Sequence, residues 1–212
     1  MKINILISFI FVLLLTSCDK HEEVDIAVDN IKPEKTGTWV DTRDNITYHW
    51  VRYSGLDWIT ENLHYTNPDS QSYTTEFGNK MLYEFGAAID AVPEGWRLPT
   101  DEDFKKLEKT LGMSDAEVDQ EDWRGAGIGT ILQQDSTGSG LHFDLSGYGW
   151  NLGGTGNYNL NIYGVYWTST TIPTIGNVAW VRRISTFNNK VERFYSTTAD
   201  RYYSIRLVRD VK

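Results

Sequence analysis

The chain contains a single cysteine, Cys18, and this constrains its fold more than any other feature. A domain without a second cysteine has no internal disulfide, so its structure must be held together by a hydrophobic core. The 212 residues suffice for one domain of ordinary size with a short extension. We therefore expect a single domain that is stabilised by packing alone.

The residues before Cys18 have the three parts of an export signal. Lys2 gives a positive start, a mainly apolar stretch runs from Ile3 to Leu15, and small residues precede Cys18. The apolar stretch has about 13 residues, whereas a membrane-spanning helix needs about 20. Residues 1–17 are therefore predicted to be a cleaved signal peptide and not a transmembrane anchor.

The end of this signal, Leu15–Cys18 with the sequence Leu-Thr-Ser-Cys, resembles a bacterial lipobox. In a lipobox the cysteine sulfur takes a diacylglycerol and the new amino terminus is acylated, and several acyl chains anchor a protein firmly. The resemblance implies a lipoprotein held through Cys18 in a lipid bilayer, expected to be the outer membrane. An ordinary signal peptide that happens to contain a cysteine is the alternative.

Residues 18–37 are charged and aperiodic, so we expect the lipidated cysteine to be followed by a flexible tether. Lys20, Glu22 and Glu23 resemble the charged surface-export signal of lipoproteins from Bacteroidetes-type bacteria, which implies the cell surface. Simple solubility of a linker explains them equally well. The net charge of −9 argues against nucleic acid as a partner.

The domain expected over residues 38–212 begins and ends with β-type segments. Short turns separate three segments near the start and three near the end, at 38–41, 46–53, 56–59, 178–184, 191–195 and 203–209. Strands at both ends with helices between them are typical of an α+β domain. We expect the two ends to pair in one antiparallel sheet.

Two helices are predicted between these strands. Leu82, Phe85 and Ile89 recur at helical spacing within 81–91. The second helix begins after Thr100, whose hydroxyl can cap the free amides, and it ends at Gly112. The remaining residues, 112–177, are rich in glycine and are predicted to be a long irregular loop with short pieces of strand.

Four strings of residues resemble a known family. They occur in the order seen in the Fibrobacter succinogenes major paralogous domain, and they are Trp58–Leu63 (WITENL), Pro93–Asp101 (PEGWRLPTD), Gly164–Thr170 (GVYWTST) and Tyr203–Val208 (YSIRLV). The family is similar in turn to the formylglycine-generating sulfatase-modifying fold and to C-type lectin-like domains. The resemblance implies a mixed fold with paired termini, two helices and a long loop region, in secreted and surface proteins.

The chemistry of these related folds does not transfer to this chain. Formylglycine-generating enzymes need cysteine thiols inside the domain, and Cys18 lies outside it. Calcium-dependent lectins need an acid on the closing strand, where this chain has Arg182 and Arg183. A structural calcium ion in the long loop, held by carbonyl and carboxylate oxygens, is left open.

No other catalytic or metal-binding pattern is present. The histidines are scattered without the spacing of metal ligands, and Gly125–Gly129 lacks the Gly-Lys-Ser/Thr ending of a phosphate loop. A Gly-x-Ser-x-Gly elbow is also missing. We therefore expect neither an enzyme nor a bound cofactor, with a hydrolase on a degenerate fold as the remote alternative.

The remaining candidate is a binding face in the long loop. Aromatic residues are 13% of the chain, and a rigid ring offers contact area for a sugar or a protein at little entropic cost. Alternatively the rings pack beneath the loop and hold it. Trp96 and Trp167 lie inside the strings that resemble the family and are expected to be core residues. The predicted ligand-binding residues are Trp123, Tyr148, Trp150, Asn151, Tyr158, Asn159 and Tyr163, and Tyr166, Asn157 and Asn161 are further candidates.

The sequence therefore predicts a non-enzymatic surface lipoprotein domain that binds a glycan or a protein. The alternative is a structural or adhesive subunit of an assembly in the cell envelope.

Overall fold

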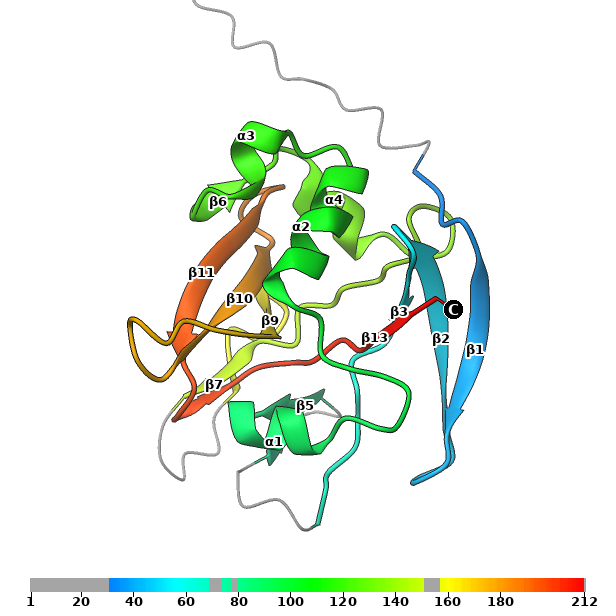
Figure 1. The fold of residues 1–212 in the computed structure, drawn as a ribbon, viewed down its shortest axis with the longest axis vertical. Coiled ribbons are helices and arrows are strands. Elements are labelled where there is room, and N and C mark those ends of the chain that lie inside the picture. The colour runs from blue at the N-terminus through cyan, green and yellow to red at the C-terminus, as the bar shows by residue number, and fades with distance from the viewer. Residues whose placement is uncertain (1–30, 69–73, 78–79, 151–156, 212) are drawn as a thin grey trace, which may run out of the picture.

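Two four-stranded antiparallel sheets form the frame of the domain, one on each side of the view in Figure 1. The computed structural model describes residues 31–68, 74–77, 80–150 and 157–211. The predicted signal peptide, Cys18 and most of the predicted tether lie outside these ranges. The mixture of helices with mostly antiparallel strands is an α+β arrangement, as the sequence predicts.

The first sheet joins the two ends of the domain, which confirms the predicted pairing of the termini. Its strands are β1 (Thr36–Asp41), β2 (Ile46–Tyr53), β3 (Leu56–Ile59) and β13 (Val208–Asp210), in the order β1-β2-β3-β13. Backbone pairing begins before β1, since the Glu34 amide donates to the Arg52 carbonyl at 3.0 Å. The last part of the predicted 18–37 tether is therefore bound to the sheet.

The second sheet contains two of the predicted closing strands and two strands from the predicted loop. Its strands are β6 (Asp122–Arg124), β11 (Val191–Thr197), β10 (Val178–Ser185) and β9 (Tyr163–Thr171), in the order β6-β11-β10-β9. The remaining strands form two small sheets. One contains β12 (Arg201–Tyr202), β7 (Tyr148–Trp150) and β8 (Asn157–Tyr158), in that order, and the other contains β4 (Thr74–Phe77) and β5 (Lys80–Tyr83).

The helices are α1 (Phe85–Asp90), α2 (Asp101–Thr110), α3 (Asp115–Val118) and α4 (Ile128–Gln133). The predicted helix 81–91 is wrong in its first residues, because Lys80–Tyr83 pairs with β4 and Tyr83 also bridges Tyr203. The prediction that 112–177 is mostly loop is also wrong in part. This segment contains α3, β6, α4, β7, β8 and β9, and the left-handed Gly127 (φ 84°) allows the sharp turn into α4.

Helix α2 begins as the sequence predicts. The Asp103 amide donates to the Thr100 hydroxyl at 3.0 Å, and the Thr100 amide donates to the Asp103 carboxylate at 2.7 Å. This reciprocal capping box satisfies two backbone donors at the helix start.

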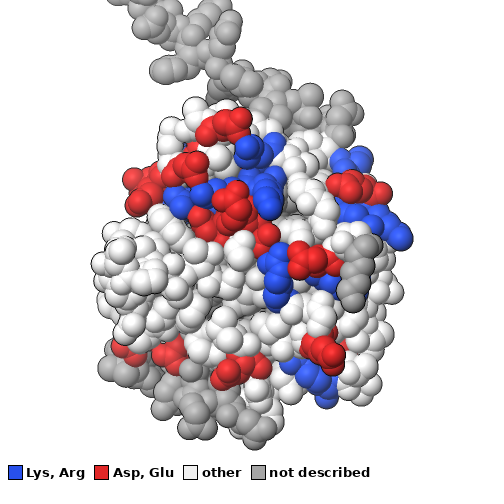
Figure 2. Space-filling model, viewed as in Figure 1, with Lys and Arg blue, Asp and Glu red and all other residues white. Residues whose placement is uncertain are grey.

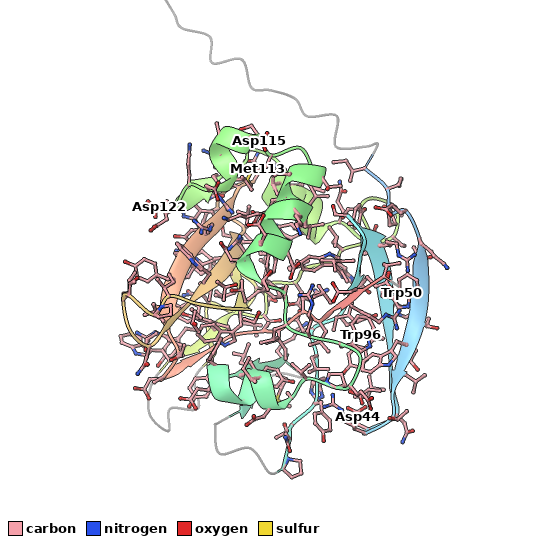
Figure 3. The ribbon with its side chains drawn as sticks, in the orientation of Figure 1. Asp44, Trp50, Trp96, Met113, Asp115 and Asp122 are labelled. Carbon is pink, nitrogen blue, oxygen red and sulfur yellow. The ribbon has the colours of Figure 1, made fainter. Side chains whose placement is uncertain are left out.

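Alternate residues along the strands pack into two different hydrophobic clusters. In β2, Tyr48 and Trp50 belong to one cluster and Val51 belongs to the other, because successive side chains of a strand point to opposite faces. Figure 3 shows Trp50 and Trp96 near the first sheet, and the Arg209 guanidinium lies over both rings. Trp96 and Trp167 are 7% and 0% exposed, which confirms their predicted place in the core.

A buried group of charges joins α2 to the second sheet. Asp101 pairs with Arg182 and Arg193, each at 2.8 Å, and Glu108 pairs with Arg124 and Arg182, each at 2.6 Å. Outside this group, acidic and basic side chains alternate over α2 and α3 at the top of Figure 2. Among the described residues, no helix has both the length and the apolar character needed to cross a bilayer.

Candidate functional site

A cavity of about 200 Å³ opens beside the second sheet, and we call it the aromatic pocket. Strands β7, β9, β10, β11 and β12 supply most of its wall. Its lining residues are Tyr148, Trp150, Val165, Arg183, Phe194, Arg201 and Tyr203. Four of the seven are aromatic and two are arginines, so the pocket offers flat rings together with hydrogen-bond donors.

One wall of the aromatic pocket comes from the pairing of β7 with β12. Trp150 lies opposite Arg201 in this ladder, and the Arg201 guanidinium lies 4.9 Å from the centre of the Trp150 ring. Gly149 allows the strands to approach, because a Cβ there would lie 2.8 Å from the Cβ of Tyr202. Trp150 is 53% exposed, so much of its ring is open to solvent.

A second part of the wall is built around Arg183 of β10. Its guanidinium lies 5.5, 4.9 and 5.0 Å from the ring centres of Trp123, Tyr163 and Phe194. These distances are those of cation–π contacts. The Arg183 Nε atom also pairs with Glu192. Arg183 is thus held by rings on several sides and by one carboxylate.

A second group of predicted residues adjoins the wall formed by β7. The Asn159 side-chain amide donates to the Tyr148 hydroxyl at 3.0 Å, and the rings of Tyr148 and Tyr158 are 6.1 Å apart. Asn159 has a left-handed backbone (φ 59°), which asparagine tolerates better than most residues. Tyr158 is 45% exposed. The exposed aromatic surface therefore extends from the pocket across β7 and β8.

The structure brings together most of the predicted ligand-binding residues. Tyr148 and Trp150 line the pocket, while Trp123 and Tyr163 surround the Arg183 that lines it. Tyr158 and Asn159 contact Tyr148, as above. Asn151 lies outside the described residues. Tyr166, a further candidate, is wrong as a binding residue because its side chain is 0% exposed and its hydroxyl donates to the Asp144 carbonyl.

Besides Val165, sequence reasoning missed four lining residues, namely Arg183, Phe194, Arg201 and Tyr203. They lie in or near the predicted closing strands, far along the chain from β7. The alternation of a strand does carry part of the signal, because Arg182 and Arg183 must point to opposite faces. Arg182 is buried against α2, which leaves Arg183 for the face of the aromatic pocket.

A second cavity, of about 300 Å³, is polar but its central groups bind one another. The Asn62 side-chain amide donates to the Asp144 carboxylate at 2.8 Å, Lys80 pairs with Asp144 at 2.6 Å, and Arg206 donates to the Asn62 oxygen at 2.6 Å. Burial opposes the charge of Asp144, but Arg206 and Lys80 outweigh it and hold its pKa below its usual value. This network connects β3 and β5 to the closing segment and has a structural role.

Within the described ranges, no group of three or more His, Cys, Asp or Glu side chains is arranged to hold a metal ion. His49 pairs with Glu61 at 2.7 Å, and the carbonyl of His142 accepts a bond from Arg206. His21 lies outside the described residues.

The comparison with known families supplies the identity of the domain. A model of the Fibrobacter succinogenes major domain matches residues 51–209. The chain belongs to this family. No curated protein and no solved structure matches the chain.

The strings that predict a Fibrobacter succinogenes major domain have structural roles here. In the string 93–101, Arg97 pairs with Asp103 at 2.5 Å and with Asp210 at 3.0 Å, and its backbone bonds to that of Val208. Asn62, of the string 58–63, holds the polar network. The aromatic pocket takes only Val165 and Tyr203 from the strings, so most of its lining lies outside them.

Proposed function

We propose that this chain is a membrane-anchored, non-enzymatic recognition domain that binds a glycan at the aromatic pocket. The observation that carries the proposal is the gathering of Tyr148, Trp150 and Tyr158 around one cavity with two of their rings exposed. Trp150 and Tyr158 are 53% and 45% exposed although the domain has two well-filled cores. Exposed apolar patches are a feature of ligand-binding grooves and of protein interaction sites.

The chemistry of the pocket suits a sugar. The C–H face of a pyranose can pack on the open faces of Trp150 and Tyr158, which offer large rigid area. The Asn159 side-chain oxygen and the Tyr148 hydroxyl oxygen, held close by their hydrogen bond, can accept bonds from sugar hydroxyls. A cavity with apolar walls and a few polar groups is the usual form of a small-ligand site.

The proposal extends to the fold and the cellular location. The pairing of β13 with β3 and the irregular region between the sheets support a C-type lectin-like or sulfatase-modifying-factor-like fold. The lipobox-like residues before Cys18 support a lipoprotein of the outer membrane, on the cell surface. The absence of a second cysteine supports a binding role, because the thiol chemistry of the related enzymes has no residue here.

Binding of residues 19–212 to an array of immobilised polysaccharides tests the proposal. This fragment contains every described element, so it retains both cores and the pocket. Trp150→Ala and Tyr158→Ala should each weaken binding by about 10-fold, as expected when a central aromatic contact is removed. Tyr195→Ala is the matched control, because Tyr195 is 40% exposed and follows Phe194, so it points to the opposite face of β11.

Binding that Trp150→Ala leaves unchanged would contradict the proposed site. A chain that binds no glycan but co-purifies in fixed ratio with an envelope protein would favour the alternative, a structural or adhesive subunit. Turnover in a hydrolase screen that disappears when one loop carboxylate is changed would favour the hydrolase alternative.

A further inference from the structure

The arginines of this chain differ in how fully they are paired. Every arginine except Arg201 and Arg206 forms an ion pair with a carboxylate of the described residues. The paired arginines are Arg43, Arg52, Arg97, Arg124, Arg182, Arg183, Arg193 and Arg209. Arg206 is buried and donates to Asn62 and to three backbone carbonyls, so its N–H donors are occupied, and its charge interacts with that of Asp144.

Arg201 is the exception, and it lines the aromatic pocket. The only hydrogen bond from its side chain to a described residue runs from one η nitrogen to the Asp200 carbonyl at 3.0 Å. Its remaining N–H groups have no acceptor among the described residues. Its guanidinium stays beside the Trp150 ring, at 4.9 Å from the ring centre. Arg201 is half-buried, so its guanidinium packs against the ring and is still accessible to a ligand.

Arg183, which also lines the pocket, is incompletely paired as well. Glu192 occupies its Nε atom, while its η nitrogens have no hydrogen-bond acceptor among the described residues. Three aromatic rings surround the guanidinium and leave its side chain 27% exposed. The pocket therefore contains two guanidinium groups with free donors, against a single carboxylate that neutralises one of them.

We propose that the aromatic pocket binds a sugar that bears a carboxylate, such as a uronic-acid residue of an acidic polysaccharide. This inference rests on the proposed function. The sugar ring packs on Trp150, and its carboxylate accepts hydrogen bonds from the free donors of Arg201 and Arg183. Planar guanidinium groups match a carboxylate in two parallel hydrogen bonds, which makes them the preferred partners of this anion. Both guanidinium groups are partly buried among the rings, which strengthens the attraction relative to bulk water.

The overall charge of the chain makes this local arrangement informative. A molecule with a net charge of −9 repels an acidic polymer at long range. Unneutralised guanidinium groups in a ring-lined pocket supply the attraction that such a ligand needs at short range. A neutral glycan would leave the donors of Arg201 without a charged acceptor.

The test compares trigalacturonate with its methyl ester, which has the same sugar rings but no charge. Calorimetry on residues 19–212 in a buffer with EDTA, which removes bridging calcium, should give at least about 10-fold tighter binding of the free acid. Arg201→Gln should remove this preference while the methyl ester binds as before. Arg201→Lys should retain part of it, because the charge remains but the planar fork is lost.

Arg52→Gln serves as the matched control. It removes one positive charge from the first sheet, where Arg52 pairs with Asp57, and should leave the preference for the acid intact. A circular-dichroism melt of each variant confirms that it is folded. Dextran sulfate and dextran form a further pair, since a sulfate bound as well as the uronate would overturn the assignment to a carboxylate.

The possible failures are distinguishable. Equal binding of the acid and the ester, sensitive to Trp150→Ala, would overturn the carboxylate and leave the proposed glycan site standing. A loss of acid preference in Arg52→Gln would assign the effect to net charge and overturn the role of Arg201. Binding of none of these sugars, charged or neutral, by a chain that binds no other glycan on the array would overturn the proposed function and this inference with it.

Discussion

At the scale of single residues, two buried tryptophans differ in the partner of the indole N–H. Trp58 and Trp167 are both 0% exposed, and the Trp167 Nε1 atom donates to the Tyr83 carbonyl at 2.7 Å. The Trp58 Nε1 atom is buried without an acceptor among the described residues. A buried donor that lacks a partner costs free energy relative to one that is paired.

Replacing each tryptophan with phenylalanine should separate the two cases. Both changes remove ring volume, but Trp167→Phe also removes a buried hydrogen bond to the Tyr83 carbonyl, which then keeps only the bond from the Tyr203 amide, whereas Trp58→Phe removes an unpaired donor. We expect Trp167→Phe to lower the free energy of unfolding by about 1–2 kcal/mol more than Trp58→Phe, as measured in urea. Equal losses would indicate that a bound water already pairs the Trp58 indole.

The same scale explains how far the site could be predicted. Tyr148 and Trp150 follow from the sequence, because rings in a Gly- and Asn-rich segment have few local neighbours to bury them. Arg183 and Arg201 could not be found, because their place in the pocket depends on which strands pair. The register that puts Arg201 opposite Trp150 joins residues far apart in the chain.

At the scale of elements, the contact of α2 with the second sheet depends on a charged residue. Asp101 is buried, which alone would raise the pKa of its carboxyl, but Arg193 and Arg182 outweigh burial and lower the pKa to about 2. Because the folded pKa lies below the usual value of 3.8, the ionised carboxylate stabilises the fold above about pH 4. This stabilisation is lost as the pH falls toward 2.

Asp101→Asn should therefore destabilise the domain in a way that depends on pH. At pH 7 we expect a loss of about 3 kcal/mol, because the buried Arg193 loses its carboxylate and the buried Arg182 keeps only that of Glu108. The difference from wild type should shrink by about 2 kcal/mol as the pH falls from 4 to 2. Urea unfolding at several pH values measures it, with the exposed Asp115→Asn as control. A difference that stays constant with pH would contradict the role of Asp101.

The elements also differ in what the sequence reveals about them. Helix α2 could be predicted because its signals are local, with a cap at Thr100 and acids in the first turn. Residues 81–83 have helical spacing, yet they form β5 because β4 and Tyr203 offer partners from elsewhere in the chain. In the predicted closing strand 203–209, a continuous strand begins only at Val208. The earlier residues make single β-bridges, Tyr203 to Tyr83 of β5 and Ser204 to Tyr166 of β9.

At the scale of the whole molecule, the anchor and the pocket are expected to be independent. The pocket and the rings around it use residues between 123 and 203. Backbone pairing to the first sheet already fixes Glu34, so only the part of the predicted tether before residue 34 is available as a linker. Roughly 15 residues between Cys18 and this point span at most about 50 Å when extended. The proposed lipid anchor on Cys18 would therefore keep the domain close to the membrane.

Replacing Cys18 with alanine tests the anchor without touching the pocket. Cys18→Ala should abolish incorporation of labelled palmitate, because the only thiol that can take the lipid is gone, and should leave the purified chain with unchanged sugar binding. Ser17→Ala, which keeps a small residue before the cut, should still incorporate the label.

Protease shaving of intact cells that express wild type then places the domain, since cleavage between Cys18 and Glu34 requires exposure on the outer face. Label that persists in Cys18→Ala would contradict the lipoprotein prediction, and protection of wild-type chain would place the pocket on the inner side, where only ligands inside the envelope reach it.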